Sequence, residues 1–157
     1  SGFTSTNYIV SNHFAGSNFW DHSKGVPSST LMSLPELQQW VAAGHEIGSH
    51  TLDHVHLPEV DSEEAQRQIQ QSKADLEQKL QTEVNAFCYP YGHKTPQIET
   101  WVRNSGYSNA TTTERGLALA TDDPFALPRI TVARSTTIFR FLQKCLTKLE
   151  HKKRYKK

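Results

Sequence analysis

Residues 45–56, which read HEIGSHTLDHVH, hold four of the eight histidines of the chain within twelve positions. Glu46 and Asp53 lie among them. Neutral imidazoles and carboxylates are side chains that bind Zn2+ and similar divalent cations. The segment therefore predicts either a metal site or a polar loop whose histidines are simply solvated.

His50 and His54 can share an ion only if the backbone turns between them. Two histidines on one zinc, each bound at about 2.0 to 2.1 Å, bring their ring nitrogens within roughly 3 to 3.5 Å of each other. Residues i and i+4 are separated by about 13 Å in a strand, whereas their Cβ atoms are about 5 to 6 Å apart on a helical turn. We therefore expect a helical turn directly after His50, capped by Ser49 or Thr51.

The segment HEIGSH differs from the zinc-protease motif His-Glu-x-x-His. Its second histidine falls at i+5, on the other side of a helix, and Gly48 disfavours a helix there. A metallohydrolase that uses Glu46 or Asp53 as its carboxylate is the weakest alternative, because Asp53 would point away from the metal-facing side of the turn.

Strands and helices alternate along the chain. Strands are predicted at 6–12, 45–50, 84–90, 107–113 and 127–133. Helix starts are predicted at Ser33-x-x-Glu36, Asp61-x-x-Glu64, Thr95-Pro96 and Thr137. This alternation indicates an α/β domain with a parallel sheet or barrel, whose sites lie at the carboxyl ends of the strands. His50 and His54 follow one such strand.

Composition indicates one globular domain, placed at residues 1–150, with a basic tail at 151–157. The formal net charge of +1 gives no indication of nucleic acid as a partner, and no apolar run approaches the length of a membrane span. The tail, HKKRYKK, is interpreted as a solvated terminus. Cys88 and Cys145 are too few and too far apart for a disulfide framework or a thiolate zinc site.

Two motifs resemble those of the polysaccharide deacetylase family, also known as the NodB-homology domain. GHEIGSHTLDH resembles the second motif of the family, whose core is His-Ser/Thr-x-x-His, here residues 50–54. FCYPYG, at 87–92, resembles the third motif in its Tyr-Pro-Tyr-Gly variant. The helix between the motifs and the run from 106 to 130 are also similar, so the resemblance extends almost to the last helix.

The resemblance implies a distorted (β/α) barrel that binds a divalent metal, usually Zn2+, and hydrolyses N- or O-linked acetyl groups of a carbohydrate polymer or glycan. It implies that His50 and His54 are metal ligands. The backbone N–H of Tyr91 would contribute to the oxyanion hole, in a turn shaped by Pro90 and Gly92 at the substrate. The side chains of Tyr89 and Tyr91 are interpreted as aromatic packing. Arg129 either binds a site carboxylate or stabilises the end of a strand.

The first motif of the family, Thr-Phe-Asp-Asp-Gly, is not found in this chain. That motif supplies the catalytic base and the metal-binding aspartate, so we expect the first strand to lie upstream of Ser1 in an N-terminally truncated domain. TDDP at 121–124 is a superficial match that we interpret as a surface turn. Cys88 stands where the third motif commonly has an arginine. LPRI at 127–130 replaces a late Leu-x-His, which leaves the general acid unassigned among His13, His22, His56 and His93.

Two functional hypotheses therefore lead. The chain is either part of a metal-dependent deacetylase, inactive alone because it lacks the base, or a domain without catalysis that binds a glycan or a protein partner. The upstream coding sequence would separate them. Phe19 and Trp20 could stack on a sugar ring, although packing over the end of the barrel explains them as well.

Overall fold

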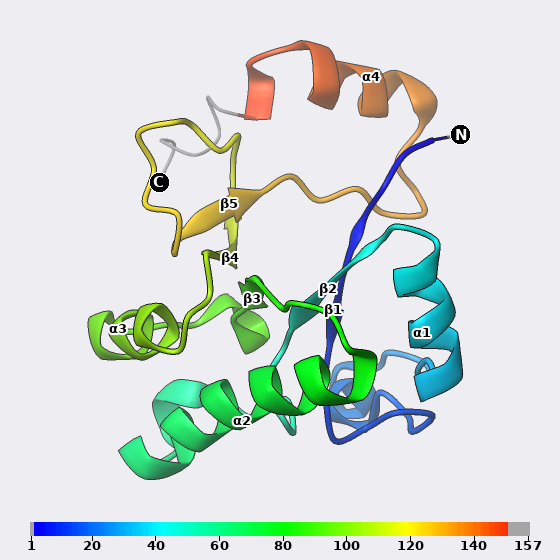
Figure 1. Ribbon diagram of the computed structural model, residues 1–157. Helices are drawn as coiled ribbons and strands as arrows, with labels where there is room; N and C mark the ends of the chain where they lie inside the picture. Colours follow the sequence, from blue (N-terminus) through cyan, green and yellow to red (C-terminus); the bar gives the residue numbers. More distant parts are fainter. Residues whose placement is uncertain (1, 151–157) are drawn as a thin grey trace.

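The fold is built on a parallel sheet whose strands follow the order of the chain (Figure 1). A computed structural model describes residues 2–150. Its five strands are β1 (Thr6–Ile9), β2 (Glu46–Ser49), β3 (Ala86–Cys88), β4 (Asn109–Arg115) and β5 (Leu127–Arg129). Each pairs in parallel with the next. All five predicted strands are confirmed, with β4 displaced by two residues and the others shorter than predicted.

Four helices and three short 3-10 helices connect or follow the strands. They are α1 (Leu34–Ala42), α2 (Ser62–Leu80), α3 (Pro96–Asn104), α4 (Ile138–Leu146), η1 (Phe19–Lys24), η2 (Leu57–Glu59) and η3 (Pro90–Gly92). The predicted helix starts are confirmed. At each of them a nearby side chain accepts a hydrogen bond from a backbone amide of the first turn or of the N-cap residue. The Asp61 carboxylate accepts from the Glu64 amide at 2.8 Å, and the Thr95 hydroxyl accepts from the Ile98 amide at 3.2 Å.

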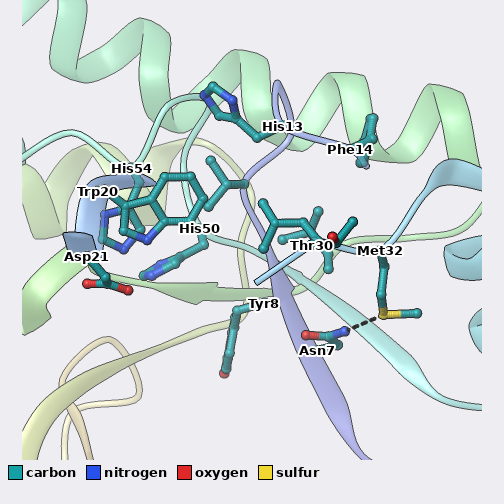
Figure 2. Close-up of a pocket in the computed structure, with 13 residues that line it drawn as sticks. Asn7, Tyr8, His13, Phe14, Trp20, Asp21, Thr30, Met32, His50 and His54 are labelled. Atoms are coloured by element: carbon teal, nitrogen blue, oxygen red, sulfur yellow. Dashed lines mark hydrogen bonds between the residues drawn. The ribbon is translucent and has the colours of Figure 1, made fainter. Parts of the chain in front are cut away.

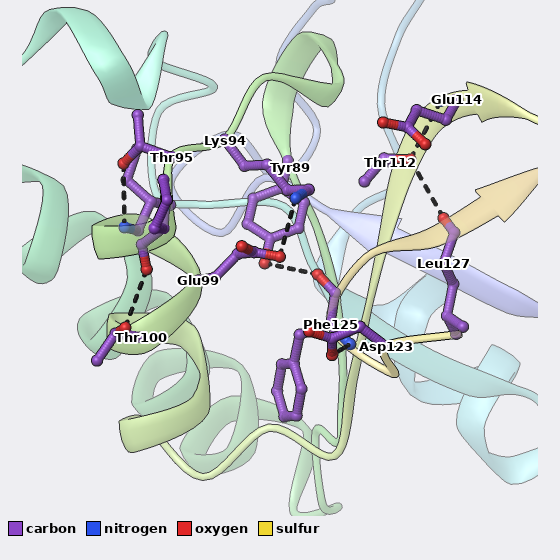
Figure 3. A network of polar contacts seen from close by, with 12 residues as sticks. Tyr89, Lys94, Thr95, Glu99, Thr100, Thr112, Glu114, Asp123, Phe125 and Leu127 are labelled. Atoms are coloured by element: carbon purple, nitrogen blue, oxygen red, sulfur yellow. Dashed lines mark hydrogen bonds and ion pairs between the residues drawn. The ribbon is translucent and has the colours of Figure 1, made fainter. Parts of the chain in front are cut away.

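The core lies where α1, α2 and α3 pack along the strands (Figure 1). Parallel strands are covered by helices because their crossovers place helices on the sheet. The apolar positions predicted for α2 are all buried: Ala65, Ile69, Leu76 and Leu80. Tyr89 is fully buried against Phe87, and its hydroxyl donates to the Phe125 carbonyl at 3.0 Å (Figure 3). The packing role predicted for the Tyr89 side chain is therefore confirmed.

The α/β class is confirmed, but the sheet of residues 2–150 is open. β1 and β5 are its two edges and do not pair with each other, as the strands of a closed barrel would. The predicted turn at 121–124 is also confirmed: the Asp123 carboxylate accepts from the Phe125 amide at 2.9 Å. The basic tail at 151–157 lies outside the described residues.

Helix α4 begins after Thr137, as predicted, yet its apolar side is not covered. Ile138 is 63% exposed and Leu142 is 43% exposed. Within residues 2–150, no helix combines the length and the hydropathy that crossing a bilayer requires.

Candidate metal centre

The end of β2 places His50 beside the end of β1. The His50 amide donates to the Ile9 carbonyl at 2.9 Å, which continues the ladder between the two strands. Beyond it, the Ser11 amide donates to the Thr51 carbonyl at 3.1 Å. The segments that follow β1 and β2 therefore leave the sheet together, and His50 lies at its carboxyl edge, as the sequence predicted.

The backbone between His50 and His54 turns through left-handed residues. The φ angles of Thr51 and His54 are 69° and 57°, so the helical turn predicted here is wrong. The cause is the set of side-chain acceptors around the turn. The Thr51 hydroxyl accepts from the His54 amide at 3.0 Å, and the Gln68 side chain of α2 accepts from the amides of Leu52 and Asp53, also at 3.0 Å. These acceptors replace the carbonyls that a helix would offer.

This turn brings the two histidine rings together. Their centroids are 4.7 Å apart and their planes are at 82°. Both rings line two adjoining cavities, of about 370 Å³ and about 460 Å³. Figure 2 shows the rings side by side at the wall of the first cavity. The pair singled out by its spacing thus converges, through a different turn from the one expected.

A single hydrogen bond fixes the orientation of His50. Its Nδ1 lies 2.6 Å from the Cys88 carbonyl oxygen of β3. Because a carbonyl can only accept, Nδ1 carries the proton and donates it. In the neutral imidazole, Nε2 of His50 is then the nitrogen that can bind a cation.

Aromatic packing orients His54, whereas a hydrogen bond orients His50. Its side chain lies parallel to Trp20, with centroids 4.7 Å apart and an interplanar angle of 10°, and meets the Tyr91 ring edge-on at 4.8 Å. The residue is 8% exposed, and its Nδ1 is buried without a hydrogen-bond partner. Burial lowers the pKa of His54 to about 4, although the nearby Asp21 carboxylate opposes this effect. His54 is therefore neutral at pH 7, as a metal ligand must be.

The two carboxylates within segment 45–56 are engaged elsewhere. The Asp53 carboxylate accepts from Asn12 and from Gln68, each at 2.8 Å, and lies 3.3 Å from Nε2 of His13. Burial alone would raise the pKa of Asp53, but these three partners lower it below its usual value. Glu46 accepts from the Thr6 hydroxyl at the beginning of β2. The alternative in which one of these carboxylates binds the metal gains no support from these contacts.

Tyr91, in the turn at 90–92, also lines the second cavity. Tyr91 and Gly92 both have positive φ angles, 59° and 76°. The Thr113 hydroxyl of β4 donates to the Tyr91 carbonyl at 3.2 Å. A Cβ on Gly92 would overlap Thr113, so glycine is required here for space as well as for its φ angle. Pro90 is buried and precedes the two left-handed residues.

Arg129 reaches the same cavity from β5. Its Nε donates to the Thr112 carbonyl at 2.6 Å, which ties β5 to β4, and its side chain lines the second cavity. This contact is the one expected if Arg129 stabilises the end of a strand, which was one of the two roles predicted for it.

Helix η1 contributes Asp21 and Lys24, which the sequence did not assign to the site, and Trp20, for which it left sugar stacking and packing open. Trp20 stacks on His54, the Lys24 ammonium lies 3.9 Å from the centroid of the Tyr91 ring, and Asp21 lines both cavities. Lys24 also pairs with Asp21 at 3.2 Å. No local motif marks these residues, because their contacts are to segments about 30 to 70 positions away. Only the aromatic character of Phe19 and Trp20 was a usable signal.

His45 and His56 line neither cavity, whereas His13 lines the first. His45 stacks on Trp40 and accepts from the Ser5 amide at 3.2 Å. His56 contacts His93, and its Nδ1 lies 2.8 Å from Glu59. Across residues 2–150, no three His, Cys, Asp or Glu side chains are grouped closely enough to hold a metal ion. His50 and His54 could therefore supply two ligands to an ion, and no third is grouped with them among the described residues.

Comparison with known proteins gives consistent matches. The polysaccharide deacetylase family model matches residues 2–110. YxkH of Bacillus subtilis, a protein assigned provisionally to the polysaccharide deacetylases, is 26% identical over 110 residues, which are 70% of this chain and 39% of YxkH.

Solved structures share the fold. The deacetylase PplD of Streptococcus pyogenes, in complex with acetate, has a TM-score of 0.76 at 20% identity, over 90% of this chain and 58% of that one. A polysaccharide deacetylase from Bacillus cereus has a TM-score of 0.73 at 23% identity, over 90% of this chain and 41% of that one. The chain thus spans between about two fifths and three fifths of the length of these proteins.

Proposed function

The chain belongs to the polysaccharide deacetylase family, and we propose on this basis that it is part of a metal-dependent hydrolase that removes acetyl groups, primarily N-linked ones, from a carbohydrate polymer or glycan. The observation that carries the proposal is the convergence of His50 and His54, with ring centroids 4.7 Å apart, at two cavities. A divalent ion there, Zn2+ in the first place, would polarise the acyl carbonyl and make a bound water more acidic.

The two imidazoles fit such an ion. His50 donates Nδ1–H to a backbone carbonyl, which is the outer contact that usually orients a metal-binding histidine. His54 is neutral and has a buried ring nitrogen without a partner. Both features are those of ligands rather than of solvated loop histidines.

The turn at 90–92, whose Tyr91 ring contacts His54, is proposed to hold the acyl group beside the histidines. The Tyr91 amide would donate to the oxyanion, where preorganised donors stabilise developing charge. Pro90 and Gly92 would shape the turn at the substrate. Arg129, which lines the same cavity, would contact the sugar or its acyl group.

We further propose that this polypeptide alone turns over little or no substrate. A catalytic zinc site has three protein ligands, and the described residues present two together. Asp53 is not free to act as the third, because Asn12 and Gln68 already donate to its carboxylate.

The same finding favours a second candidate function, a domain of this family that binds a glycan or a partner without hydrolysing it. Under that alternative the cavities would still accept a sugar. The absence of a third ligand among the described residues would then be a property of the working protein.

Zn2+ affinity tests the proposal directly. Competition with a chromophoric chelator should show binding at least about 10-fold weaker for His50→Ala and for His54→Ala. Asp53→Asn is the matched control within the same turn, and its affinity should stay within about 2-fold. Equal Zn2+ binding by wild type and both alanine variants would refute the metal site.

Acetate release tests the low turnover proposed for this polypeptide. With Zn2+ and an N-acetylated chito-oligosaccharide, wild type should release little or no acetate, and release that is lost in His54→Ala would refute this part of the proposal. Because little or no release is expected under both functions, the coding sequence upstream of Ser1 separates them: a strand ending in two adjacent aspartates there would favour the hydrolase.

A further inference from the structure

Trp20 makes a stacked ring contact with His54. The two rings are nearly parallel, with centroids 4.7 Å apart and an interplanar angle of 10° (Figure 2). The other rings around His54, those of His50 and Tyr91, meet it at 82° and 85°. An edge contact leaves the plane of a ring freer to tilt than a stacked contact does, so Trp20 is the neighbour that defines the plane of His54.

No hydrogen bond fixes His54 as the Cys88 carbonyl fixes His50. Nδ1 of His54 is buried and unpartnered, and the one polar anchor near it, the Thr51 hydroxyl, holds the His54 backbone amide at 3.0 Å. The backbone position of His54 is therefore fixed, whereas the direction of its ring depends on packing.

Trp20 is itself held in place. Its ring lies 5.1 Å from Phe19 and 5.7 Å from His13, both in edge contacts. Asn18, just before η1, closes the loop: its side chain accepts from the Ser29 amide at 2.6 Å and donates to the Pro27 carbonyl at 3.1 Å. A loop closed in this way presents Trp20 as a fixed surface.

We propose that Trp20 is a positioning residue for the metal centre: its stacked ring holds the His54 imidazole in the orientation in which His50 and His54 bind one ion. The inference rests on the proposed function. It assigns to η1 a part in the site, although η1 lies outside both motifs that resemble the family. Because aromatic stacking contributes about 0.5 to 1.5 kcal/mol beyond burial, loss of the ring should weaken metal binding up to about 10-fold.

The test compares two tryptophans that both stack on a histidine. Trp40 lies 4.3 Å from His45, outside the cavities, at an interplanar angle of 28°. Zn2+ affinity should fall about 10-fold in Trp20→Leu, stay within about 3-fold in Trp20→Phe, which keeps a flat ring, and not change in Trp40→Leu. The ligand-field spectrum of bound Co2+ should change in Trp20→Leu alone, which a purely structural role would not produce.

A second measurement needs no truncation of Trp20. In the double variant Trp40→Phe and Trp101→Phe, Trp20 is the remaining tryptophan of the chain. Co2+ should quench its fluorescence at the concentrations at which it binds. Absence of quenching, despite binding, would overturn the inference.

The outcomes distinguish this inference from the proposed function. If Trp20→Leu binds Zn2+ like wild type while His54→Ala does not, the positioning role is wrong and the metal site stands. If Trp40→Leu is weakened as much as Trp20→Leu, the effect is general destabilisation and the positioning role is again wrong. If His54→Ala binds as wild type does, the metal site itself is wrong.

Discussion

His50 and His54 are four positions apart, yet different interactions fix the positions of their rings. His50 continues the ladder of β1 and β2, and its ring donates to the Cys88 carbonyl of β3. His54 lies on a left-handed turn outside the sheet, with a ring surrounded by Trp20 and Tyr91. The sheet thus positions one histidine through backbone geometry, whereas loops position the other through packing.

The left-handed turn that carries His54 has a cost in free energy. A non-glycine residue in the left-handed region costs of order 1 to 3 kcal/mol, and both Thr51 and His54 lie there. The acceptors on Thr51 and Gln68 offset this cost by satisfying the amides of the turn. We therefore expect His54 to depend on more of the structure than His50 does.

The largest effect is expected at Gln68, which is 1% exposed and accepts from two amides of the turn, those of buried Leu52 and half-buried Asp53. Gln68→Ala leaves both amides without an acceptor, so the free energy of unfolding should fall by about 2 to 4 kcal/mol in urea titrations. Gln71→Ala, an exposed site on the same helix, should change it by less than about 0.5 kcal/mol. Similar losses in the two variants would contradict the role given to Gln68.

A pH effect should single out His54. Its pKa is lowered to about 4 in the folded protein, from about 6.5, so the unfolded chain binds the proton more readily. The stabilising contribution is complete above pH 6.5 and is lost as the pH falls towards 4. Between pH 7 and pH 4.5, wild type should lose about 2 to 3 kcal/mol more unfolding free energy than His54→Gln. Parallel pH profiles for the two proteins would show that His54 is not buried as described.

The smallest effect is expected at Thr51. Thr51→Ala removes the acceptor of the His54 amide but keeps the left-handed backbone, so thermal or urea unfolding should show a loss of about 1 to 2 kcal/mol. Thr51→Ser retains the hydroxyl and should recover most of that loss. If serine is no better than alanine, the methyl group of Thr51 rather than its hydroxyl stabilises the turn.

Much of the fold could be predicted because its signals are local. Helices α1, α2 and α3 each begin one residue after a capping side chain, that of Ser33, Asp61 or Thr95. Strand β2 ends at Ser49, directly before His50. The spacing of His50 and His54 singled them out as a candidate pair, but the helical turn on which that inference depended does not form.

The details of the turn could not be predicted, because they depend on distant residues. Gln68 meets the turn from α2, and Trp20 meets His54 from a segment 34 positions earlier in the sequence. Barrel closure likewise depends on which strands pair at the sheet edges, a long-range property that hydrophobic patterns do not report.

The two thiols differ in accessibility in a way that is useful at the bench. Cys88 is 3% exposed within β3, whereas Cys145 is exposed on α4. A maleimide dye added to the folded protein will therefore couple at Cys145, with no need to mutate a competing cysteine. The rate at which a second dye couples at Cys88 then measures the opening of the central strand, β3.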